Sequence, residues 1–207
     1  MAMGYDSFVW EWAERRGLEH CQLWTSPDGA KAQGLVVVDW KDRVIRLRYS
    51  ISFLSDWHLR LCHVFSLANN SQRSISLSRD RGSHWIVDGT PRVDLESCVA
   101  VDILDTPFPK TMIVRSLRLE EGRSTTVKVA YIDNRRLLIR PIEQEWERLP
   151  TLRQNWRRYR CTTMETAMEL EVDEQSIVVL CLHQWRLMKG PEFFSNEGEV
   201  SDEERGK

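Results

Sequence analysis

The chain has 207 residues, of which 42% are hydrophobic and 29% are charged, a composition typical of a soluble globular protein that buries a sizeable core. Its 29 basic and 31 acidic residues nearly cancel, so no global field favours binding to nucleic acid or to an anionic membrane. No apolar run approaches the roughly 18 residues of a membrane helix, and the first residues, MAMGYDSFVWEWAERRG, lack the basic start and long apolar run of a secretory signal.

The first segment with a pattern, FVWEWAERRG (8–17), fits a short helix and a strand almost equally well, because Phe8 and Trp12 share a face in either conformation. The next, Arg43–Phe53, alternates strictly. Ile45, Leu47 and their partners fall on one face, while Arg46 and Arg48 fall on the other. This alternation predicts a half-buried strand.

Similar two-residue periodicity recurs at 73–79, 125–132 and 159–172, and residues 176–187 begin as an apolar run typical of a central strand. Turn-forming groups separate these runs at short intervals, and Asp88-Gly89 is a good hairpin turn because Gly accepts positive φ. Closely spaced strands without intervening helices predict an all-β fold built on a single antiparallel sheet.

Residues 95–119, LESCVAVDILDTPFPKTMIVRSLRL, read as two strands joined at a proline-rich corner. Alternation in the first strand places Asp102 on a face of small residues, which leaves room for a cavity. Asp102 is then either a polar group in a ligand cavity, or a structural carboxylate bound to a turn or paired with Arg115 or Arg118 of the next strand. Asp105 is three residues away and faces the opposite side, which argues against a catalytic carboxylate pair.

Motifs for metal, phosphate or nucleophilic chemistry are absent from the sequence. The five histidines have no metal-binding spacing, the ten glycines are scattered singly, and no GxSxG elbow occurs. The five cysteines form no CxxC pair, which favours buried reduced thiols and a cytoplasmic location over a zinc ribbon or a disulfide framework. We therefore predict no metal, no cofactor and no identifiable catalytic residue.

Aromatic residues are more conspicuous than any catalytic motif. Most of the nine tryptophans must lie in the core, and a few could line an apolar groove suited to an amphiphile with a polar head. The segment RQNWRRYR (153–160) interleaves arginines with aromatics as some nucleic-acid sites do. The balanced net charge favours instead a loop whose arginines answer the acidic run EQEWE (143–147).

Long blocks of the sequence carry a family resemblance: GLEHCQLW (17–24), LRYSISFLSDWHLR (47–60), GTPRVDLESCVAVDILDTPFPKTMIVRSL (89–117), VAYIDNRRLLIRPIEQEW (129–146) and YRCTTMETAMELEVDE (159–174). In order and wording they resemble a bacterial glycolipid-binding family, formerly a domain of unknown function. The resemblance implies one long sheet wound into a spiral β-roll or half-barrel, similar to lipoprotein carriers, and a role in binding a glycolipid or similar amphiphile.

The positions that match the family pattern are Glu19, His20, Cys21, Trp57, Asp102, Thr106, Pro107, Phe108, Thr111, Arg115, Tyr131 and Gln144. Two places depart from it. Lys110 stands where the family corner usually has Asn, and CLHQWRLM (181–188) replaces a tyrosine–proline–glycine stretch.

We therefore predict one β-roll domain over residues 1–190, followed by an acidic disordered tail over 191–207. The predicted function is binding of an amphiphilic small molecule, and the oligomeric state stays open. The predicted ligand-binding residues are His20, Arg46, Arg48, Trp57, Asp102, Phe108, Arg115, Tyr131 and Gln144, with the arginines facing an anionic head group. The alternatives are a hydrolase of lipid or sugar esters that uses Asp102 with His20 or another remote histidine, and a protein-interaction module that uses the tail.

Overall fold

A computed structural model describes residues 5–41, 43–68, 71–80, 82, 84–151 and 153–190; the predicted tail lies outside them. The first half of the chain contains β1 (Asp6–Trp12), β2 (Gly17–Ser26), β3 (Gly29–Trp40), β4 (Arg43–Phe53), β5 (Leu59–Ala68), β6 (Ser71–Arg79), β7 (Trp85–Val87), β8 (Thr90–Pro91) and a 3-10 turn, η1 (Val93–Leu95). The second half contains β9 (Cys98–Ile103), α1 (Phe108–Leu117), β10 (Ser124–Asp133), β11 (Leu138–Leu149), β12 (Arg157–Thr162), β13 (Ala167–Val172), β14 (Val178–Cys181) and β15 (Trp185–Lys189).

The fifteen strands of the described residues belong to one sheet, in the order β8-β7-β6-β5-β4-β3-β2-β1-β15-β14-β13-β12-β11-β10-β9. The chain starts in the middle at β1 and runs outward to β8. It then crosses to the far edge at β9 and returns to the middle, where β15 pairs with β1. The predicted all-β class is confirmed, but the sheet is mixed rather than wholly antiparallel, because β9 and β10 are parallel.

The second strand predicted after the proline corner is wrong, since Phe108–Leu117 forms the helix α1. Pro107 precedes the helix and Pro109 lies in its first turn, where the missing N–H breaks no helical hydrogen bond. A parallel pair needs a crossover connection, and α1 supplies it between β9 and β10. The N-terminal segment that fitted helix or strand is a strand, β1.

Other strand predictions hold with refined bounds. The run at 43–53 coincides with β4, and those at 73–79 and 125–132 lie within β6 and β10. The run at 159–172 is instead a hairpin, β12 and β13, with a turn at 163–166, and residues 176–187 cover β14, a turn and most of β15. These two hairpins were mistaken for single runs because their turns contain no Gly or Pro.

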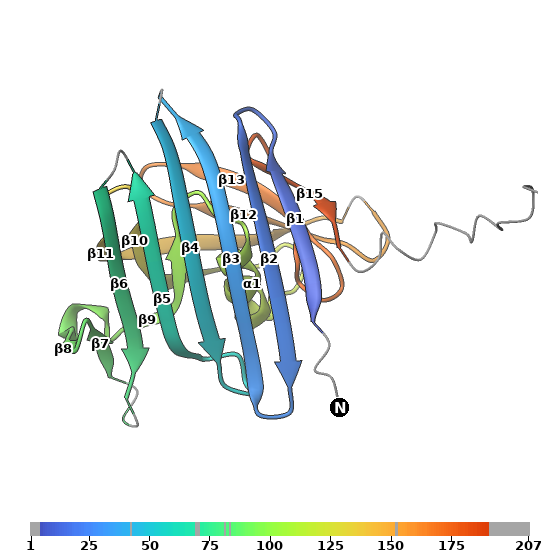
Figure 1. The fold of residues 1–207 in the computed structure, drawn as a ribbon. Coiled ribbons are helices and arrows are strands. Elements are labelled where there is room, and N and C mark those ends of the chain that lie inside the picture. Colours follow the sequence, from blue (N-terminus) through green and yellow to red (C-terminus); the bar gives the residue numbers. More distant parts are fainter. Residues whose placement is uncertain are drawn as a thin grey trace, which may run out of the picture.

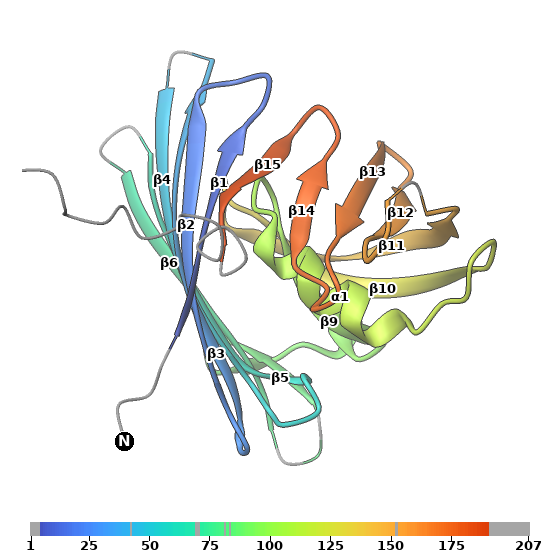
Figure 2. The same ribbon diagram turned by 90° about the vertical axis from the view of Figure 1, so that its right-hand side faces the viewer.

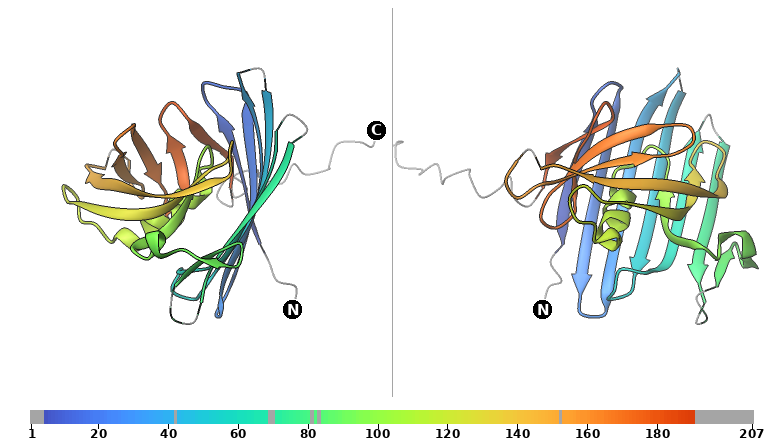
Figure 3. Two further views of the ribbon diagram at one scale, coloured as in Figure 1. Left: turned by 90° about the vertical axis from the view of Figure 1, so that its left-hand side faces the viewer. Right: turned by 180° about the vertical axis from the view of Figure 1, so that it is seen from behind.

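The sheet folds over so that β1 to β6 form one layer and the strands of the second half form another (Figures 1 and 2). Seen from behind, β10 to β13 cross the long strands of the first layer at an angle (Figure 3). Helix α1 lies between the layers. It packs on β9 and β14, and the ring of Phe108 stacks on Tyr49 of β4 with 6.2 Å between centroids. The helix therefore fills the space that a hollow roll would leave open.

Side chains join the two outer edges of the sheet. The indole of Trp85 in β7 donates to the carbonyl of Cys98 in β9 over 3.3 Å, and the guanidinium of Arg79 donates to the same oxygen. These bonds fix how far the second layer folds over the first, and so set the position of β9 and its Asp102.

Candidate functional site

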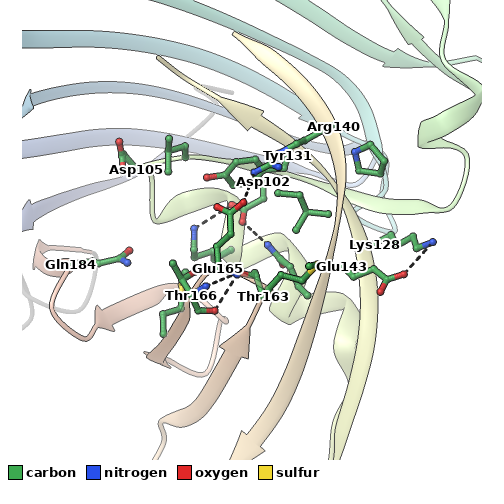
Figure 4. Close-up of a pocket in the computed structure, with 17 residues that line it drawn as sticks. Asp102, Asp105, Lys128, Tyr131, Arg140, Glu143, Thr163, Glu165, Thr166 and Gln184 are labelled. Atoms are coloured by element: carbon green, nitrogen blue, oxygen red, sulfur yellow. Dashed lines mark hydrogen bonds and ion pairs between the residues drawn. The ribbon is translucent and has the colours of Figure 1, made fainter. Parts of the chain in front are cut away.

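A cavity of about 510 Å³ lies beside the first turn of α1, on the second layer of the sheet (Figure 4). This volume falls within the range of about 300–1,000 Å³ that is typical of small-molecule sites. Its lining comes from β9 and the following loop, α1, β10, β11, the β12–β13 turn and the β14–β15 turn: Asp102, Leu104, Asp105, Lys110, Lys128, Tyr131, Arg140, Pro141, Ile142, Glu143, Gln144, Thr163, Met164, Glu165, Thr166, Met168 and Gln184.

The floor of the cavity is a buried polar network around Asp102. Lys110 Nζ lies 3.2 Å from Asp102 Oδ1, and Gln144 Nε2 donates to Asp102 Oδ2 over 2.8 Å. Lys110 also donates to the carbonyl of Thr106 over 3.3 Å, and Trp146 Nε1 donates to Gln144 Oε1 over 3.1 Å. Each carboxylate oxygen of Asp102 therefore has a donor, which offsets much of the cost of burying it.

Local structure explains why these three groups meet. Asp102 lies near the end of β9, and Lys110 follows it in the first turn of the helix that covers this strand. On β11, two-residue alternation turns Ile142, Gln144 and Trp146 toward the interior and leaves the intervening glutamates exposed to solvent. Of the two alternatives for Asp102, the structure combines parts of both, because the carboxylate is ion-paired and also lines a cavity. Its partner is Lys110 and not an arginine.

Burial and charge shift the pKa values at this floor. Burial is the largest influence on Lys110 and lowers its pKa, but the charge and hydrogen bond of Asp102, together with the nearby Cys181 and Cys161, raise it by more in sum. The net pKa is raised, and the ammonium stays charged. Burial, reinforced by the charge of Asp102, raises the pKa of the half-buried Tyr131. Tyr131 therefore keeps its phenolic proton and offers it as a donor.

The mouth of the cavity is formed by the β12–β13 turn and by β11. Thr163 Oγ1 accepts the backbone N–H groups of Glu165 and Thr166 and so holds the turn tight, with Met164 fully exposed at its tip. Across the mouth, Arg140 Nη2 lies 3.1 Å from Glu165 Oε1. Apolar walls beneath a charged rim are suited to a ligand that has both apolar and polar parts.

Three of the nine predicted ligand-binding residues, Asp102, Tyr131 and Gln144, meet in this cavity. Phe108 is fully buried against Tyr49 and lies outside the lining. Arg115 and Trp57 form a separate pair, with the guanidinium carbon 3.8 Å from the indole centroid. This contact ties the end of α1 to the β4–β5 turn.

The remaining three predicted residues, His20, Arg46 and Arg48, lie on the face of the first layer that points away from α1, since Glu19, Cys21 and Leu47 take the inner positions. His20 and Arg48 line a shallow groove of about 470 Å³ on that face. His20 bonds to Ser7 Oγ over 3.0 Å. The structure thus does not bring His20 to Asp102, and no histidine of the described residues lines the cavity that contains Asp102.

Sequence reasoning missed Lys110, Arg140, Ile142 and the β12–β13 turn. Lys110 was recognised only as a departure from a family pattern, although a helix that began at the prolines would have aimed it back at β9. Alternation along β11 already placed Ile142 on the face of Gln144. Nothing local in the sequence marks Arg140 or Glu165, because their meeting depends on how two hairpins pack.

A second buried polar group lies under the other side of α1. Tyr49 hydroxyl donates to Glu19 Oε1 over 2.6 Å, and its ring crosses β3 at Gly34, where a Cβ would lie only 2.0 Å from Tyr49 Cζ. Complete burial raises the pKa of Glu19 to about 8, against the smaller lowering effects of Tyr49, Lys110 and the Phe108 amide. Glu19 is therefore largely protonated at neutral pH.

Among the residues that the structure describes, no three His, Cys, Asp or Glu side chains are grouped to hold a metal ion. No helix in those same ranges is long and apolar enough to cross a membrane. What the cavity offers is a set of fixed hydrogen-bonding groups beside apolar walls, an arrangement that can bind and orient a ligand.

Comparison with known proteins supports the fold and assigns the family. A crystal structure of a DUF1089 family protein from Pseudomonas aeruginosa superimposes with a TM-score of 0.64 at 26% identity, covering 78% of this chain and 88% of that chain. No curated protein matches this sequence. Residues 7–186 match the family described as "Putative glycolipid-binding". Because this match spans most of the chain, the protein belongs to that family.

Proposed function

We propose that this protein binds a glycolipid or a similar amphiphile in the cavity beside α1. The observation that carries the proposal is the convergence of a buried hydrogen-bonding floor, Asp102 with Gln144 and Tyr131, and apolar side chains such as Ile142 and Met168 in one cavity. The family description supports a binding role of this kind.

The location of the site differs from that in a hollow carrier. Because α1 fills the space between the two layers, the ligand sits beside the first turn of the helix and not along the whole sheet. A cavity of about 510 Å³ takes a head group and the first part of a chain, while the rest of the chain extends past Met164 at the mouth.

The same proposal places the protein in the cytoplasm. All five cysteines are free and buried, which fits a compartment where thiols stay reduced.

The test is isothermal titration calorimetry with decyl maltoside, which is kept below its critical micelle concentration. Wild-type protein should bind it saturably at one site. Ile142→Trp fills the cavity with a larger ring and should weaken binding by about tenfold or more, as expected when a well-packed site is blocked.

Val44→Trp is the matched control, because Val44 is exposed on β4 in the other half of the sheet. It should leave the affinity unchanged, and melting curves should show that both variants are folded. Absence of saturable binding to the wild-type protein, or equal loss in the two variants, would refute the proposal.

A further inference from the structure

Every charged side chain that lines the cavity has a partner of opposite charge. The four pairs are Asp102–Lys110 at 3.2 Å, Asp105–Arg135 at 3.0 Å, Lys128–Glu143 at 3.2 Å and Arg140–Glu165 at 3.1 Å. The pairs come from separate elements, so the balance belongs to the assembled site and not to one segment. Among the described residues, the lining therefore carries no charge that awaits a ligand.

The floor nevertheless keeps hydrogen-bonding capacity. Trp146 donates to Gln144 Oε1, so the amide nitrogen is the atom that faces Asp102, and only one of its two N–H groups is used there. Each Asp102 oxygen receives one protein donor and keeps lone pairs, and the Tyr131 hydroxyl is protonated. Hydrogen-bond donors and acceptors thus lie close together at the floor. A ligand group that both donates and accepts hydrogen bonds requires this arrangement.

From this charge balance, and resting on the proposed function, we infer that the cavity selects an uncharged, hydroxyl-bearing head group and that the Arg140–Glu165 pair at its mouth enforces the selection. A hydroxyl can accept from Gln144 and Tyr131 and donate to Asp102 without disturbing any ion pair.

A charged head group, in contrast, would have to break an existing ion pair of the cavity. A sulfate or phosphate would have to draw Arg140 from Glu165 or Lys110 from Asp102, leaving a carboxylate without its cation. A cationic head group would equally have to displace one of the paired cations. The cost is largest at the floor, where Asp102 and Lys110 are both buried.

The experiment compares three amphiphiles with the same chain, decyl maltoside, decyl sulfate and decyltrimethylammonium, by calorimetry at low ionic strength. Decyl maltoside should bind about tenfold more tightly than either charged compound, since disturbing the buried Asp102–Lys110 pair costs at least that factor. Equal binding of the three compounds would overturn this inference and leave the proposed function standing. If none of them binds, both fall.

The decisive variant is Glu165→Gln, which releases Arg140 at the mouth. Because Glu165 is exposed on a turn, the fold is kept. The ratio of the decyl sulfate affinity to the decyl maltoside affinity should rise about two- to fivefold at low salt. Glu145→Gln removes the same charge from the outer face of β11 and should change neither affinity. An identical response of the two variants would overturn the role of the pair.

Binding of free maltose distinguishes a sugar head group that is carried on a lipid from a free sugar. Binding that is much weaker than that of decyl maltoside supports a lipid-borne head group. If maltose alone binds as tightly, the head-group selection stands and the amphiphile part of the proposed function falls.

Discussion

The two halves of the sheet are built on different principles. In the first half, the long strands β1 to β6 place apolar residues such as Leu47 and Ile51 on the buried face and polar residues outside. Ten buried polar or charged side chains occur among the described residues, and eight of them, from Asp102 to Ser176, lie in the second half. The first half is thus a packed apolar support, whereas the second half contains most of the buried polar and charged groups that can bind a ligand.

The difference shows how one sheet can be both stable and functional. Burying polar groups costs stability unless each finds a partner. The second half therefore needs hydrogen bonds and ion pairs to offset the burial of the polar groups at its cavity. The uniform apolar packing of the first half, extended by α1, compensates for that cost. Changes in the two halves should accordingly have different signatures.

The largest effect is expected from Lys110→Met, which leaves Asp102 buried without its cation. The free energy of unfolding in urea should fall by about 3–5 kcal/mol, as for other broken buried pairs. Lys128→Met is the control, because the Lys128–Glu143 pair is exposed and should contribute less than about 1 kcal/mol.

Adding Asp102→Asn to Lys110→Met should restore much of the lost stability, since the unpaired charge is then gone. If Lys110→Met is no more destabilising than Lys128→Met, the buried network does not hold the second half together.

Leu47→Ala should destabilise the first half of the sheet without changing ligand binding at the cavity. Leu47 is fully buried on β4, and the lost contacts and residual cavity should cost about 2–5 kcal/mol in chemical denaturation. Affinity for decyl maltoside should not change at temperatures where the variant is folded. A parallel fall in affinity would mean that the two halves are not separable; exposed Val44→Ala should alter neither quantity.

Glu19 is an exception to the apolar packing of the first half, since its carboxyl group is buried there. Its pKa is about 8 in the folded protein and 4.5 as an ordinary glutamate, so the unfolded chain releases the proton first as pH rises. Its contribution to stability is greatest below pH 4.5 and is lost as pH rises through 8.

The measurement is the unfolding free energy of the wild type and of Glu19→Gln at pH 6 and pH 8. The wild type should lose about 2–3 kcal/mol more than the variant over these two pH units. Parallel pH dependences would show that Glu19 ionises normally.

Strands were predictable from the sequence because they obey a local rule. Alternation in β4 marks both its bounds and its faces, and it assigned Arg46 and Arg48 to the outer side. What alternation does not reveal is which residues cross the molecule to meet. His20 and Arg48 were therefore predicted to bind the same ligand as Asp102, although they lie on the opposite face.

The missed helix accounts for two other errors at once. TMIVRSL has the β-branched residues of a strand, and this local preference was followed, whereas packing on β9 decides for the helix. Without α1 no crossover exists, and the parallel β9–β10 pair cannot be anticipated. The partner of Asp102 was lost with it, because Lys110 approaches the carboxylate only from a helix.

The pairing of β1 with β15 has a consequence for how the protein is made. Trp12 pairs with Trp185, so β1 is synthesised long before β15, the strand that completes its pairing. Until then β1 has one open edge, which is a template for joining other chains, and the contact that closes the sheet is among the most distant in sequence. Such non-local closure makes folding slow. Until β15 is made, the centre of the finished sheet is therefore itself an edge that is open to pairing with another chain.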